Sequence, residues 1–209
     1  KFNLFIMDYI DQILSSKDDN SRYETRLKLY PHDKSIIDDA VKEVEKRIKN
    51  QKKSFVIYGE PQCGKTELMI HICCKLFDLG IDMIVVLMHD IKALQMQNFN
   101  NRFAKEEHFR VKAMTENDFA DIEDKDRHSK NGEKWLIVGR KNGSLLQKLI
   151  DNSRRIKNRV IIDDEADFAT PNRNVQGTDK KLGDKASPIN DYVKKLVGDG
   201  FWIGVTATP

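Results

Sequence analysis

The sequence predicts an α/β domain built on a doubly wound, mostly parallel sheet with helices on both faces. Short apolar runs alternate with longer segments that carry apolar residues at helical spacing. Apolar runs without polar alternation are typical of parallel strands buried on both sides, and right-handed crossovers then bring helices to each face. The third observation is a glycine-containing turn, residues 59–64, between the first apolar run and the helix-like segment after it.

A helical extension is expected ahead of this sheet. Residues 2–15 hold apolar residues near helical spacing, which predicts an amphipathic helix. The polar stretch 15–26 is expected to be a connector. A second helix is expected to begin behind Ser35, because the acid three residues later completes a capping box. We therefore expect an extension, residues 1–50, that packs on a domain formed by residues 51–209.

Each strand is expected where apolar, often β-branched, residues run together between turn signals. Five such runs lie at residues 55–58, 83–88, 135–138, 160–162 and 201–205, and a weaker sixth lies at 109–114. Segments with helical periodicity lie between them, at residues 65–79, 91–106, 143–156 and 189–198. Two segments are expected to be loops. Residues 121–134 are rich in charge, and residues 171–188 combine charge with glycine and proline.

The composition limits the class of protein. Charged residues make up 33% and hydrophobic residues 39% of the 209 residues, which suits a folded domain rather than a disordered chain. The net charge of +3 is too small for a long-range field that collects nucleic acid, so a polyanion would need local patches. No apolar run reaches the roughly 18 residues of a membrane span. Three cysteines without paired spacing predict reduced thiols and a cytoplasmic location.

The turn after the first strand carries a phosphate-binding motif. Residues 59–66 match G-x-x-x-x-G-K-[ST] at every fixed position. The two glycines let the backbone wrap so that its N–H groups face a phosphate, and the positive end of the next helix adds to the attraction. Lys65 would reach the β- and γ-phosphates, and the Thr66 hydroxyl would ligate Mg²⁺. The residues expected to bind ATP are Gly59, Glu60, Pro61, Gln62, Cys63, Gly64, Lys65, Thr66 and Glu67.

Acids at the end of the strand at 160–162 would complete this site. Parallel sheets bind ligands at the carboxyl ends of their strands, so these acids would face the phosphates. A magnesium nucleotide needs one carboxylate at the metal and a second acid that orients or deprotonates the attacking water. Asp164 and Glu165 fit these roles and, with Lys65, are the expected catalytic residues. The register stays open, because Asp163 could hold the metal and Asp164 the water.

Two further motifs carry a resemblance to a known family. Residues 164–167 are Asp-Glu-Ala-Asp, and residues 206–209, at the end of a strand, are Thr-Ala-Thr-Pro. With the phosphate motif, they make residues 54–209 resemble the first RecA-like motor domain of DEAD-type, superfamily-two helicases and translocases. Residues 161–167 and 202–209 look similar, more closely, to the Z-one domain ATPases linked to restriction-like endonucleases in bacteria.

The resemblance implies a role for each residue of these motifs. Asp164 would ligate Mg²⁺ together with Thr66, and Glu165 would be the catalytic base. Asp167 would pair with Thr206 or Thr208. The residues implied to couple the nucleotide state to domain movement are Asp167, Thr206, Ala207 and Thr208.

Nucleic acid is the partner that the resemblance implies, DNA rather than RNA. In the family, a Pro-Thr element after the phosphate-binding helix and its following strand grips nucleic acid, whereas this chain has Met-His-Asp at residues 88–90. A strand end that opens a helix, residues 140–142, offers side chains and backbone N–H groups to a phosphate. The residues expected to contact nucleic acid are Arg140, Lys141, Asn142, His89 and Gln97.

The resemblance further implies a second RecA-like domain C-terminal to this segment, and a nuclease domain or subunit as a possible partner. Such a second domain supplies an arginine finger, which contributes about 10³–10⁵ in rate. The 209 residues alone are therefore expected to hydrolyse ATP slowly. Two other functions stay open: a nucleotide-dependent switch or scaffold in a defence or restriction complex, and a small-molecule kinase.

Overall fold

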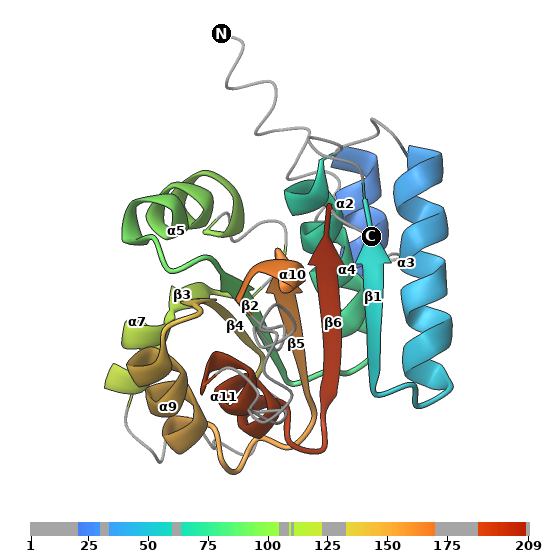
Figure 1. Ribbon diagram of the computed structural model, residues 1–209. Helices are drawn as coiled ribbons and strands as arrows, with labels where there is room; N and C mark the ends of the chain where they lie inside the picture. The colour runs from blue at the N-terminus through green and yellow to red at the C-terminus, as the bar shows by residue number, and fades with distance from the viewer. Residues whose placement is uncertain are drawn as a thin grey trace, which may run out of the picture.

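The computed structural model describes residues 21–29, 34–59, 64–104, 109, 111–122, 133–169 and 188–207. Six parallel strands form one sheet in the order β1-β6-β5-β2-β4-β3 (Figure 1). The strands are β1 (Ser54–Tyr58), β2 (Met83–Met88), β3 (Ala113–Thr115), β4 (Trp135–Arg140), β5 (Arg159–Asp164) and β6 (Phe201–Thr206). The predicted α/β fold class is confirmed.

The predicted strands are confirmed to within two residues at each end, apart from the sixth. That strand was expected at residues 109–114, whereas β3 begins only at Ala113 and pairs at the edge of the sheet with β4. The central strands β2 and β5 are almost fully buried along their length. Burial on both faces explains why these strands show no polar alternation in the sequence.

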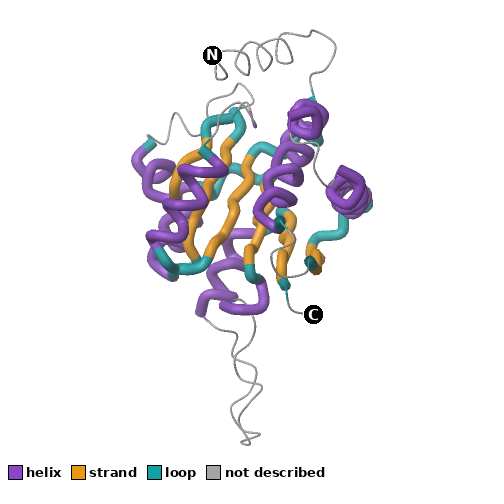
Figure 2. The backbone as a smooth tube through the Cα atoms, turned by 90° about the horizontal axis from the view of Figure 1, so that it is seen from above, coloured by secondary structure: helices purple, strands orange, loops and turns teal. Residues whose placement is uncertain are grey.

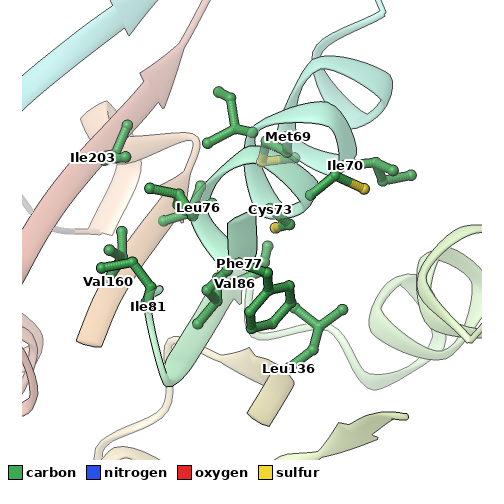
Figure 3. Packing of buried hydrophobic residues seen from close by; sticks show 14 of the residues in the cluster. Met69, Ile70, Cys73, Leu76, Phe77, Ile81, Val86, Leu136, Val160 and Ile203 are labelled. Carbon is green, nitrogen blue, oxygen red and sulfur yellow. The ribbon is translucent and has the colours of Figure 1, made fainter. Parts of the chain in front are cut away.

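Two separate hydrophobic clusters cover the two faces of the sheet. Because side chains alternate along a strand, Val86 points into one cluster and Val85 into the other. The first cluster contains α4 (Lys65–Asp78), and Figure 3 shows its side chains packed against Val86, Leu136 and Val160. The second contains α9 (Gly143–Asn152) and α11 (Pro188–Val197). Figure 2 shows the resulting three layers from above.

The helices between the strands are confirmed, with some differences in extent. The segment predicted as one helix at 91–106 is α5 (Lys92–Asn98) followed by a π-helix, η1 (Phe99–Phe103). A short helix, α7 (Glu116–Asp121), was not predicted. Its signal was present in the sequence: Thr115 and Asp118 form a capping box in which both reciprocal hydrogen bonds are made. The remaining helix, α10 (Ala166–Ala169), follows β5 directly.

Two helices ahead of β1 pack on α4, on the first face of the sheet. Helix α3 (Lys34–Lys49) begins one residue before Ser35, so the prediction that Ser35 caps this helix is wrong. Helix α2 (Arg22–Leu29) lies where a connector was predicted, which is a second error. Its first turn is held by a carboxylate from another helix, because Asp78 of α4 accepts hydrogen bonds from the backbone N–H groups of Arg22 and Tyr23, both 2.9 Å long.

We expect Asp78→Ala to lower the free energy of unfolding by about 2–4 kcal/mol, because α2 loses both backbone hydrogen bonds and the ion pair with Arg22. Urea unfolding of the wild type and the variant measures this. Asp82→Ala is the matched control: Asp82 is 44% exposed and its carboxylate lies 3.9 Å from Lys134. A loss of equal size in both variants would contradict the role given to Asp78.

Some expectations fall outside the described residues, namely the helix at 2–15 and most of the loops at 121–134 and 171–188.

Cys73 and Cys74 are buried thiols on α4, and burial raises the pKa of Cys74 to about 12. Within the described part of the chain, the structure contains no helix that combines the length and apolar character of a membrane span.

Candidate functional site

Three motifs that are far apart in the sequence meet at the carboxyl ends of neighbouring strands. Strand β6 lies between β1 and β5, with Tyr58 in register with Thr206 and Asp164 in register with Val205. The backbone N–H of Gly59 donates to the carbonyl oxygen of Thr206 at 3.0 Å. The phosphate motif, the acids and the threonine segment therefore share one edge of the sheet, which is the edge where parallel sheets bind ligands.

The phosphate motif has the strand–turn–helix context that its chemistry requires. Gly64 has φ +82°, in the left-handed region that glycine adopts without strain, and α4 begins at the next residue, Lys65. Lys65 and Thr66 are partly exposed in the first turn of this helix, where N–H groups lack partners within the helix. The other motif residues expected to bind ATP, Glu60, Pro61, Gln62 and Cys63, lie outside the described residues.

Lys65 and Asp164 share an electrostatic environment. The pKa of Asp164 is raised to about 6, because burial disfavours its charge and the Glu165 carboxylate repels it. The positive charges of Lys141 and Lys65 oppose this rise. The Lys65 charge thus lowers the pKa of the acid that ends β5, in agreement with the strand order that brings the phosphate motif and this acid to one edge of the sheet.

A magnesium nucleotide fits the oxygen donors of this site. Mg²⁺ prefers one or two carboxylates, together with substrate phosphates and water. Thr66 and Asp164 supply a hydroxyl and a carboxylate. Among the described residues, no three His, Cys, Asp or Glu side chains gather into a metal centre. One hydroxyl and one carboxylate are the protein donors that suit an ion which also binds phosphates and water.

The structure decides the register of the acids. The Asp163 carboxylate is fully buried and lies 3.0 Å from the Lys141 ammonium, while the indole Nε1 of Trp202 donates to it at 3.3 Å. It therefore faces the interior, on the side of the sheet that carries α9 and α11. Asp164 is partly exposed at the strand end. The burial of Asp163 and its ion pair with Lys141 argue against the alternative in which Asp163 holds the metal.

Glu165 is held in an unusual backbone conformation. Its φ is +51°, one of two positive values among the described residues that are not glycine. A side chain in this region is strained, and such strain is found at functional sites where the surroundings enforce it. The turn ends β5 abruptly and leaves the Glu165 side chain exposed.

Asp167 and Thr206 form the pair that the resemblance implied. The Thr206 hydroxyl donates to an Asp167 carboxylate oxygen at 2.6 Å, which ties α10 to the end of β6. Glycine at position 204 lets the Trp202 ring and α10 pack closely on β6, because an added Cβ would lie 2.6 Å from the Trp202 ring and 3.0 Å from the Cβ of Ala166. Ala207 follows directly and is partly exposed, whereas Thr208 lies outside the described residues.

The Glu67 carboxylate points away from the phosphate motif. It accepts a hydrogen bond from Nε of Arg26 at 3.1 Å, and the buried Arg26 guanidinium forms a second contact through Nη2. Nδ1 of His71 lies 3.3 Å away. Any contact of Glu67 with a nucleotide would therefore come from its backbone N–H group. No sequence pattern indicates this ion pair, because Arg26 lies 41 residues away on α2.

The residues expected to contact nucleic acid differ in their accessibility. Lys141 is only 4% exposed and contacts protein oxygens, so the prediction that its side chain binds a phosphate is wrong. Arg140 and Asn142 remain at the surface of the strand end. The Asp90 carboxylate bridges them. One of its oxygens lies 3.5 Å from Nη1 of Arg140, and the other accepts a hydrogen bond from the Asn142 amide at 2.9 Å. A phosphate at this place must displace Asp90. His89 is partly exposed and Gln97 is exposed.

A buried polar pair beneath this surface was missed by the sequence reasoning. Glu116 is fully buried and accepts from Nε2 of Gln95 at 2.5 Å and from Nε of Arg140 at 3.2 Å. Gln95 also donates to the carbonyl of Val138 at 2.7 Å. These contacts fix Arg140 on β4, with α5 and α7 on either side. Only the buried position of Gln95 distinguishes it from its exposed neighbours, and the sequence does not show burial.

A cavity of about 950 Å³ lies at another place. It is lined by Lys53 and Ser54 at the start of β1, by Trp202 and Ala166, and by one side of α11. Lys53 and Ser54 lie at the amino end of β1, whereas the phosphate motif follows the carboxyl end of that strand, and Ala166 lines the cavity from the side of the acid motif.

Comparisons with known proteins were made for the whole chain. A family model described as "Type III restriction enzyme, res subunit" matches residues 26–209. A comparison with curated proteins found no match. Among solved structures, the chain is similar to a "Sulfolobus solfataricus SWI2/SNF2 ATPase core in complex with dsDNA", with 15% identity and a TM-score of 0.42. That match covers 78% of this chain and 30% of the other, so this chain spans less than a third of its length.

Proposed function

Because the chain belongs to the family of type III restriction enzyme res subunits, we propose that it is a motor domain that hydrolyses ATP to drive movement along DNA. The observation that supports this most is that Lys65, at the start of α4 behind β1, and Asp164, at the end of β5, lie at the same edge of the sheet on either side of β6. The family supports a helicase-type ATPase motor in general. The proposal adds two points: residues 164–167 act as a DEAD-type motif, and the motor acts on DNA.

Each residue of the site has a defined task in this proposal. Lys65 and the N–H groups at the start of α4 bind the β- and γ-phosphates. Thr66 and Asp164 hold the magnesium ion, which when bound neutralises charge on the phosphates. Glu165 accepts the proton of the water that attacks the γ-phosphate. Asp163 takes no part in metal binding, because it is buried on the other side of the strand end.

The pair of Asp167 and Thr206 is proposed to transmit the nucleotide state. It joins the turn after Glu165 to the end of β6, whose Thr206 carbonyl also accepts from Gly59. If a change at the γ-phosphate moves one of these two strand ends, the other strand end would therefore move with it. In the proposal, the segment from Thr206 to Thr208 carries this change toward a second RecA-like domain.

DNA is proposed to pass over the strand ends of β2 and β4. Arg140 and Asn142 lie there, next to the exposed face of α5 with Gln97. Asp90 shields Arg140 in the absence of a phosphate. The choice of DNA over RNA rests on the family, since restriction acts on DNA. A second motor domain and a nuclease partner belong to the same proposal.

Phosphate release by the full-length protein tests this function. We expect ATP hydrolysis to rise severalfold when double-stranded DNA is added, and the rise to fall with salt because phosphate contacts release counterions. RNA of equal length is the comparison polymer, and Lys65→Met is the inactive control. Hydrolysis that no polymer changes would contradict a motor and favour a nucleotide switch.

A further inference from the structure

Lys141 is a buried cation at the point where the phosphate site and the proposed DNA surface meet. Its ammonium donates to the carbonyl oxygen of Asp164 at 2.6 Å and to that of Glu165 at 2.9 Å. It also lies 3.0 Å from the Asp163 carboxylate, with only 1% of the Lys141 side chain exposed. The ammonium therefore makes two hydrogen bonds to backbone carbonyls and one ion pair with a buried carboxylate.

The two carbonyls belong to the turn that presents the catalytic base. Glu165 has φ +51°, and the carbonyls that Lys141 binds lie before and after its Cα atom. A non-glycine residue stays in this region only when its surroundings hold it there. Lys141 supplies such a constraint from a different strand. The buried Asp163 carboxylate in turn fixes the ammonium, so the three groups form one unit.

We infer that Lys141 is a positioning residue that holds Glu165 at the phosphate site, an inference that rests on the proposed function. Lys141 does not itself reach a nucleotide, because its ammonium is enclosed by the protein. It acts through the backbone of residues 164 and 165. Its loss leaves the groups that bind the nucleotide in place and disturbs the placement of the base.

The same residue connects this turn to the proposed DNA surface. Lys141 lies between Arg140 and Asn142, and its backbone N–H donates to the carbonyl of Met88 at 2.9 Å. The ends of β2, β4 and β5 are therefore joined through one residue. A phosphate that displaces Asp90 from Arg140 and Asn142 acts on the chain segment that carries Lys141. Lys141 thus links DNA binding to the position of Glu165.

Lys141→Met in the full-length protein tests the inference. Removal of the cation also affects the buried Asp163 carboxylate, so the double variant Lys141→Met, Asp163→Asn separates stability from positioning. We expect the single variant to unfold at a lower temperature and the double variant to recover most of that loss. Turnover with saturating ATP and DNA should stay about 10–100-fold low in both.

The readouts distinguish positioning from a structural role. The KM for ATP should change less than about threefold, because Lys65 and Thr66 are untouched, and the ratio of DNA-stimulated to basal hydrolysis should fall toward one. Lys141→Gln, which keeps a donor for one carbonyl, should lose less turnover. Lys148→Met, on the exposed side of α9, is the control expected to match the wild type.

The outcomes separate this inference from the proposed function. If the wild type is stimulated by DNA and the stable double variant turns over and responds to DNA like the wild type, Lys141 has only a structural role and the inference is overturned. If the wild type shows no ATP hydrolysis with DNA, the proposed function fails and the inference fails with it.

Discussion

Glu165→Gln is expected to lower kcat for ATP hydrolysis about 10²–10⁴-fold, the contribution typical of a general base. The amide has the shape of the carboxylate but does not accept the proton of the attacking water. Glu165 is exposed at the end of β5 and its side chain is not packed in the core, so the fold should not change. The variant should therefore bind ATP and release phosphate very slowly.

Single-turnover phosphate release and binding of a fluorescent ATP analogue measure the two parts of this prediction. Glu43→Gln is the matched control, because Glu43 is 47% exposed on α3 and pairs only with its helical neighbours Lys46 and Arg47 among the ion pairs of the described residues. If Glu165→Gln turns over ATP near the wild-type rate, the catalytic base is another residue. Loss of ATP binding would instead show that Glu165 helps to hold the nucleotide.

Asp164→Asn is expected to abolish magnesium-dependent turnover and, without nucleotide, to stabilise the protein by about 3 kcal/mol at pH 8. The reason is that the folded protein raises the pKa of Asp164 from 3.8 to about 6, a rise that corresponds to about 3 kcal/mol at pH values above it. Above pH 6 the ionised carboxylate is a cost that the neutral amide lacks. Active sites commonly carry such costs, because function requires a destabilised group.

The upward direction of the Asp164 pKa shift determines how the stability gained by Asp164→Asn depends on pH. A raised folded pKa means that the folded state binds the proton more tightly, so the contribution of Asp164 to stability is full below about pH 4 and is lost as the pH rises through about 6. The advantage of Asp164→Asn should therefore be largest at pH 8 and vanish near pH 4. Urea unfolding at both values measures it. An advantage that is constant with pH would contradict the raised pKa.

Magnesium and ATP should reverse the order of stability of the wild type and Asp164→Asn. A ligand that binds the folded state stabilises it in proportion to its affinity. The wild type, whose ionised Asp164 is proposed to hold the metal, should gain stability when magnesium and ATP are added at pH 8. Asp164→Asn should gain less. Equal gains would place the metal on other ligands.

Much of the candidate site followed from the sequence because it is built from backbone geometry. The phosphate motif needs glycines at fixed spacing and a helix behind them, and both requirements are local. The acids at 163–167 were placed at the same edge from one rule about parallel strands. The pairing of Asp167 with Thr206 followed from the family resemblance, and the hydrogen bond between them is present.

Two of the errors share one cause, which is contact between distant segments. Helix α2 was missed because part of its cap is Asp78, 56 residues from Arg22. Lys141 was predicted to contact nucleic acid because it lies at a strand end that opens a helix, where side chains and backbone N–H groups can hold a phosphate. Its partners, Asp163 and the carbonyls at 164 and 165, lie on another strand. The predicted role failed where burial reversed the ordinary preference of a charged side chain.

The sequence by itself determined the fold class, the strands and the position of the phosphate motif in the chain, because hydrophobic periodicity and turn chemistry depend on neighbours in the chain. Only the tertiary structure decided which of Asp163 and Asp164 is buried against Lys141 and which is partly exposed at the strand end, and where Lys141 and Glu67 direct their charges. The physical reason is that the free energy of a charge depends on the solvent and charges within a few ångströms of it. Those surroundings come from segments that the chain order does not bring together.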